Sequence, residues 1–106
     1  MPFYLLQASY SHEAWVRMTR KRKSGDDNGS MAAKTIKPVV ERQGGKYVNG
    51  WIAFGEYDAV VIMEMADNKA AASVSIALSA GTDFKAVKTT PLMTVEEGRA
   101  ALKAVK

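Results

Sequence analysis

One histidine, and one tyrosine that lies between two carboxylates, are the side chains of this sequence best suited to move a proton. His12 is the only histidine, and an imidazole that titrates near neutral pH can act as a general base. Tyr57 lies between Glu56 and Asp58, and paired carboxylates can serve acid–base chemistry or bind a hard cation. We therefore take His12 and Tyr57 as the candidate catalytic residues.

Each of these residues also has a structural explanation, which we favour. His12 follows Ser11, a residue type that caps helices, so His12 would face solvent in a first helical turn. Gly55 precedes the acidic pair, and glycine and aspartate are typical of tight turns. One histidine and no cysteine provide too few ligands for a zinc site, and a haem would need His12 as its axial ligand. We expect no metal and no cofactor.

A second group of candidates could line a pocket for a small, flat, largely apolar ligand. Aromatic walls with a few polar groups are typical of small-molecule sites. Ordinary core or interface packing explains the same aromatic residues, because aromatic side chains dominate both. The candidate ligand-binding residues are Tyr10, Trp15, Trp51, Phe54, Glu56 and Asp58.

A basic run supplies much of the net charge of +4. Its members are Arg17, Arg20, Lys21, Arg22 and Lys23. Such a run could bind nucleic acid or another polyanion. No aromatic residue is interleaved with these charges to stack on bases, so we favour a solvated helix end that leads into a loop. We do not expect nucleic-acid binding.

Length and composition indicate one domain over residues 1–106. The content of 47% hydrophobic and 25% charged residues is ordinary for a soluble globular protein. No apolar run approaches the roughly 20 residues of a membrane-spanning helix, and the N-terminus has no basic signal-peptide segment. The absence of cysteine is compatible with a reducing compartment. We expect a cytoplasmic protein with no membrane partner.

Apolar periodicity and turn residues predict the order of helices and strands. The predicted strands lie at 3–10, 46–54, 58–65 and 84–92. The predicted helices begin after Ser11, Ser30, Asp67 and Thr94. A basic and polar loop at about 20–30, which we expect to be mobile, separates the first two helical segments.

This order, β-α-β-β-α-β with a terminal helix, is the ferredoxin-like arrangement of an α+β domain with an antiparallel sheet. Such a sheet carries its helices on one face and leaves the other face bare. Alternation along the second strand predicts Val48, Ile52 and Phe54 on one face, with Tyr47, Asn49 and Trp51 on the other. The bare face is apolar in either register, and an exposed apolar face is typical of an interaction surface. Two such faces packed together would form a homodimer, a dimeric α/β barrel.

One segment carries a family resemblance. Residues 54–58 (FGEYD), followed by the apolar strand 59–62 (AVVI), resemble the signature of GYD-domain proteins. The flanking matches are 10–15 (YSHEAW), the pair Gly44 and Gly45 before the second strand, and Asp67 after the apolar strand. The resemblance covers nearly the whole chain. Residues 20–30 are more basic than the family pattern, and nothing carries over there.

The resemblance implies a ferredoxin-like fold of the dimeric α/β barrel group. That wider group includes cofactor-independent monooxygenases, haem-degrading enzymes, isomerases and ligand-sensing domains. The GYD family itself brings no single activity to this chain, and a shared fold does not fix a function.

Three functional hypotheses follow. The one we favour is a homodimer, joined through the sheet face, that binds a small apolar or aromatic ligand. The second is a cofactor-independent enzyme, similar to monooxygenases or isomerases, that uses His12, Tyr10 or Tyr57 on a small aromatic or enolic substrate. The third is a structural interaction module in which the sheet face serves assembly alone. The first two predict a concave cavity on which polar groups converge, and the third predicts a filled interface.

Overall fold

The helices and strands of the computed structural model, which describes residues 1–24 and 31–106, follow the predicted order. They are β1 (Phe3–Tyr10), α1 (His12–Ser24), α2 (Met31–Thr35), α3 (Lys37–Arg42), β2 (Lys46–Ile52), β3 (Ala59–Glu64), α4 (Asn68–Ala80), β4 (Phe84–Pro91) and α5 (Val95–Lys103). The loop predicted at about 20–30 falls partly outside the described residues, since 25–30 are not among them and 20–24 form the end of α1.

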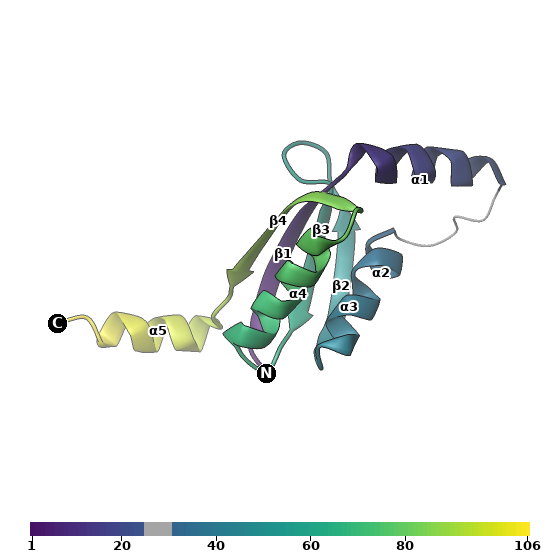
Figure 1. Cartoon of the computed structure of the whole chain (residues 1–106). Helices are drawn as coiled ribbons and strands as arrows, with labels where there is room; N and C mark the ends of the chain where they lie inside the picture. Colours follow the sequence, from purple (N-terminus) through teal and green to yellow (C-terminus); the bar gives the residue numbers. More distant parts are fainter. Residues whose placement is uncertain (25–30) are drawn as a thin grey trace.

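The four strands form one antiparallel sheet in the order β2-β3-β1-β4, which is the ferredoxin-like topology. Helices α2, α3 and α4 lie over one face of this sheet, whereas α1 and α5 extend away from it in opposite directions (Figure 1). Strand β4 lies at the edge of the sheet and ends at Pro91. An edge position suits proline because proline has no backbone N–H to donate to a further strand.

The core lies between the sheet and the helices on this covered face. Alternate residues of β1 and β3 point into it, because successive side chains of a strand point to opposite faces. Burying one such side chain contributes about 1.5–3 kcal/mol. The principal buried residues are Tyr4, Leu6, Ala8 and Tyr10 of β1, Ala59, Val61 and Met63 of β3, Val39 and Val40 of α3, and Ala71, Val74 and Leu78 of α4.

A bulge at Val48 changes which residues of β2 face the core. Tyr47 pairs with Met63, but the next paired residue is Asn49, opposite Ile62, so Val48 is an extra residue. Tyr47 therefore packs against the core, whereas Trp51 lies opposite Val60 on the bare face. Simple alternation was right to place Trp51 opposite to Ile52 but wrong to place Tyr47 with Trp51, because the inserted Val48 reverses the phase between Tyr47 and the rest of the strand.

The bare face of the sheet carries a stripe of apolar side chains across β2, β3 and β1. Trp51 is 52% exposed, and its strand neighbours on this face are partly exposed as well. We call these residues the sheet stripe; they are Phe3, Leu5, Trp51, Val60 and Ile62.

Helix α5 also leaves apolar side chains in solvent. Thr94, after which this helix was predicted to begin, forms a capping box with Glu97, and the hydrogen bonds from Thr94 hold the pKa of the Glu97 carboxyl below its usual value. Val95 and Leu102, seven residues apart on one helix face, are each 74% exposed. A nine-residue helix is marginal on its own in water, so this apolar face indicates a surface that a partner would cover.

Candidate functional site

The end of β1 at Tyr10 is joined to the start of β4 by hydrogen bonds around Ser11. The backbone N–H of Ser11 donates to the carbonyl of Asp83 at 2.9 Å, and its hydroxyl donates to the carbonyl of Thr82 at 2.6 Å. The same hydroxyl accepts from the N–H of Ala14 at 3.1 Å and caps α1, as predicted. These bonds place the first turn of α1 beside the loop that connects α4 to β4.

The Tyr10 ring lies between two aromatic neighbours. It stacks on Phe84 with ring centres 4.9 Å apart and meets the edge of Trp15 at 5.5 Å. The Trp15 side chain itself is 42% exposed, so it closes the aromatic cluster on the solvent side. The structure thus brings together two of the predicted ligand-binding residues, Tyr10 and Trp15. Their third aromatic neighbour, Phe84, was not among the predicted ligand-binding residues.

The hydroxyl of Tyr10 is buried, and among the described residues it makes no well-formed hydrogen bond. Burial raises the pKa of this phenol, and the nearby Tyr47, Asp58 and Asp83 raise it further. An interaction with the Thr35 side chain opposes this shift of the pKa. A buried hydroxyl without a partner costs about 1–3 kcal/mol, so this atom is a candidate for contact with a ligand.

The β2–β3 loop, which contains Glu56, Tyr57 and Asp58, is tied to the same end of β1. A carboxylate oxygen of Asp58 accepts the backbone N–H of Tyr10 at 3.0 Å, and the Ser9 hydroxyl donates to the carbonyl of Glu56 at 2.8 Å. Gly55 has a φ of +129°, a conformation that favours glycine. Asp58 thus anchors the β2–β3 loop to the end of β1. This is a structural role, which is the explanation we favoured for Glu56 and Asp58.

A hollow of about 320 Å³ opens next to Tyr10, between α2 and α3 on one side and the α4–β4 connection on the other. Two of its lining residues, Thr35 and Phe84, also interact with the side chain of Tyr10. Its volume lies at the lower end of the range of ligand pockets, about 300–1,000 Å³. We call it the Tyr10 hollow; it is lined by Lys34, Thr35, Pro38, Val39, Arg42, Ala77, Leu78, Gly81, Asp83 and Phe84.

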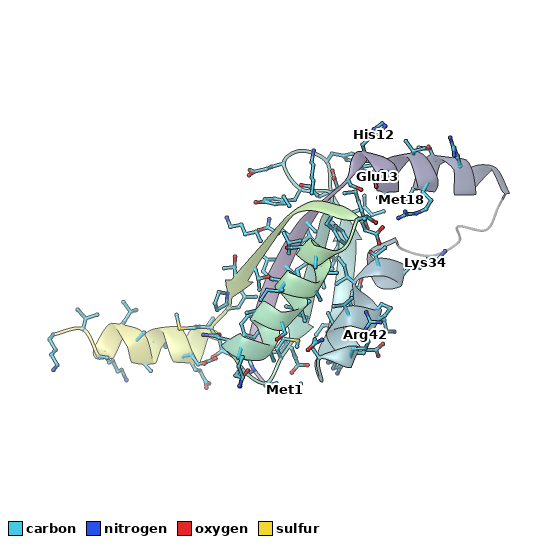
Figure 2. All side chains as sticks on the ribbon, viewed as in Figure 1. Met1, His12, Glu13, Met18, Lys34 and Arg42 are labelled. Carbon is cyan, nitrogen blue, oxygen red and sulfur yellow. The ribbon has the colours of Figure 1, made fainter. Side chains whose placement is uncertain are left out.

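The remaining predicted site residues lie apart from this hollow. His12 is exposed, on the side of α1 that faces away from the sheet (Figure 2). Glu56 and Phe54 are exposed in the β2–β3 loop, Phe54 by 99%, and Tyr57 is half-buried there. Trp51 lies on the bare face, opposite to the face of Tyr10.

A second hollow of similar size lies at the other end of the same face, between α4 and β4. Here Tyr4 donates its hydroxyl hydrogen to Asn68 Oδ1 at 2.7 Å, and the hydroxyls of Ser75 and Thr89 form a hydrogen bond. The polar groups that line this hollow are thus satisfied within the fold.

No three His, Cys, Asp or Glu side chains within residues 1–24 and 31–106 gather closely enough to hold a metal ion. In the same described ranges, no helix has the length and apolar character needed to cross a bilayer.

In a comparison of sequences, the family model of the GYD domain matches residues 4–102, which is nearly the whole chain. No curated protein matches the sequence.

Among solved structures, the chain is similar to one described as the crystal structure of MtbAldR, with a TM-score of 0.56 and 11% identity. The match covers 88% of this chain and 52% of that chain, so this chain spans about half the length of its structural relative. At this identity the similarity supports the ferredoxin-like fold and nothing more specific.

Proposed function

This chain belongs to the GYD domain family, and we propose that it is a homodimer, joined through the bare face of the sheet, that binds a small molecule. The observation that carries the proposal is the sheet stripe, since Trp51 and its neighbours form a continuous apolar surface that none of the described helices covers. Contiguous apolar surface of this kind is typical of interaction sites.

A second copy is the partner that best fits this surface. A two-fold axis through the stripe would place equivalent apolar side chains against one another, as in other isologous interfaces. The exposed apolar residues of α5 would gain a neighbour in the same assembly. We propose that this dimer acts in the cytoplasm, in line with the cysteine-free composition.

The Tyr10 hollow supports the ligand-binding part of the proposal. It lies on the covered face of the sheet, so a dimer formed through the other face would leave it open. A cavity beside an unpartnered hydroxyl favours a binding function over a module that serves assembly alone.

An enzyme remains the alternative proposal, and one observation favours it. The Tyr10 hydroxyl, next to the Tyr10 hollow, is protonated at neutral pH and can donate a proton, although burial raises its pKa and so makes it a weaker acid. His12 and Tyr57 would have to act at a different place, because neither lines this hollow.

The homodimer is tested by sedimentation equilibrium at micromolar concentration. We expect a dimeric mass for the wild type and a monomeric mass for Trp51→Glu, because each interface would then bury two unpaired carboxylates. The expected loss of dimer affinity is about a hundredfold or more. The matched control is Ile76→Glu, since Ile76 is 68% exposed on α4, away from the sheet stripe. A monomeric wild type, or equal loss in both variants, would refute the proposed dimer.

A further inference from the structure

The Tyr10 hollow has one wall rich in positive charge. Lys34 of α2 and Arg42 of α3 both line it, and both stand on the same side of the sheet (Figure 2). Among the described lining residues Asp83 is the one carboxylate, and it forms an ion pair with Arg17 of α1. Two cations and one carboxylate give the described lining a formal charge of +1 (2 − 1).

Apolar side chains share the lining with the charged ones. Pro38 and Val39 come from α3, Leu78 comes from the last turns of α4, and Phe84 begins β4. Leu78 and Phe84 are themselves buried, so their positions are fixed by the core. A lining that combines apolar side chains with a basic wall suits a small ligand that has an apolar part and one charged end.

Tyr10 lies next to the hollow without lining it, and two lining residues connect it to the hollow. Phe84 stacks on the Tyr10 ring, and Thr35 interacts with the Tyr10 side chain. The Tyr10 hydroxyl has no hydrogen-bond partner among the described residues, so a ligand oxygen that reaches it would provide an acceptor. Beside the basic wall, the Tyr10 hydroxyl is therefore a second donor close to the hollow.

We propose that the Tyr10 hollow binds a small organic carboxylate with an apolar body. The guanidinium of Arg42 holds the carboxylate, since its planar fork matches the two carboxylate oxygens. The apolar body lies against Leu78 and Phe84. This inference rests on the proposed small-molecule function and adds the chemical class of the ligand.

The test is isothermal titration calorimetry of the full-length protein at constant ionic strength with three probes. Benzoate carries the charge and the ring, benzamide carries the ring alone, and acetate carries the charge with almost no apolar body. We expect benzoate to bind at least about tenfold more tightly than either of the others, because a charge-assisted hydrogen bond contributes about 1.5–3 kcal/mol. Equal binding of benzoate and benzamide would overturn the carboxylate inference while supporting a small-molecule pocket. Absence of heat with every probe would overturn both.

Two variants place the binding in this hollow. Arg42→Gln should weaken benzoate about tenfold or more and leave benzamide unchanged. The matched control is Arg99→Gln, because Arg99 is an exposed arginine on α5, outside the lining of the hollow. Equal benzoate affinity in both variants would overturn the assignment to Arg42. The dimeric mass of Arg42→Gln, measured in parallel, separates a loss of ligand from a loss of assembly.

Discussion

Tyr4 and Tyr10 lie at opposite ends of the core face of β1 and are equally buried, each 2% exposed, but their hydroxyl groups differ. Tyr4 donates to Asn68 at the start of α4. Tyr10 has no such acceptor among the described residues, although Thr35, Asp58 and Asp83 are near enough to shift its pKa. Each tyrosine borders a hollow of the same volume, about 320 Å³.

The difference separates a structural end of the sheet from a candidate binding end. At the Tyr4 end every polar contact described above is made within the chain, so the hollow there offers a ligand little that the fold has not already used. At the Tyr10 end a donor is buried without a partner, and a cationic wall stands beside it. Buried polar groups are nearly always satisfied in folded proteins, so such an exception calls for a functional explanation.

The largest effect on the free energy of unfolding is expected from two carboxylates, Asp58 at the Tyr10 end of the sheet and Asp67 at the Tyr4 end. Asp58→Ala removes the acceptor of the Tyr10 backbone N–H and should lower the free energy of unfolding by about 2 kcal/mol, since hydrogen bonds to charged groups contribute about 1.5–3 kcal/mol. Asp67→Ala removes the cap of α4 at the Tyr4 end and should cost about 1 kcal/mol. Urea unfolding measures both. A smaller loss for Asp58→Ala than for Asp67→Ala would show that the loop is not anchored as described.

A smaller difference is expected between the two tyrosines themselves. Tyr4→Phe breaks the bond to Asn68 and should cost about 1 kcal/mol of unfolding free energy. Tyr10→Phe removes a hydroxyl that has no partner, so its stability should equal or exceed that of the wild type. Each variant is the control of the other, because the two positions share strand, face and burial. A loss of stability in Tyr10→Phe equal to that in Tyr4→Phe would remove the contrast between the two ends.

The smallest effect concerns pH. Because burial raises the pKa of Tyr10 in the folded state, its neutral form contributes stability that is fully present below pH about 10, the pKa of an unfolded tyrosine. This contribution is lost as the pH rises through the raised folded pKa. The unfolding free energy of the wild type should therefore fall more steeply above pH about 10 than that of Tyr10→Phe. Parallel curves for the two proteins would contradict the assigned shift.

Much of the fold could be predicted because its signals are local. The capping box at Thr94 and Glu97, the serine cap of α1 and the glycine pair after α3 each act within a few residues of the chain. Gly44 takes a left-handed φ of +80°, and its N–H donates to Glu41 while that of Gly45 donates to Val40, which is the Schellman end of a helix.

The site was harder to predict because its parts come from distant segments. Thr35, Arg42 and Phe84 belong to three separate elements, and no spacing in the sequence relates them. The bulge at Val48 has no local signal either, and it moved Trp51 to the opposite face from Tyr47. A buried tyrosine at the end of a strand was visible in the sequence, but whether its hydroxyl has a partner depends on the packed structure.

Amide chemical shifts measured during a benzoate titration show whether a small organic carboxylate binds at the Tyr10 end of the sheet. We expect saturable shifts at Thr35, Arg42 and Phe84, which line the Tyr10 hollow. We expect no saturable shifts at Asn68, Ser75 and Thr89, which line the hollow at the Tyr4 end. Shifts confined to this second group, or no saturable shift in either group, would contradict carboxylate binding at the Tyr10 end.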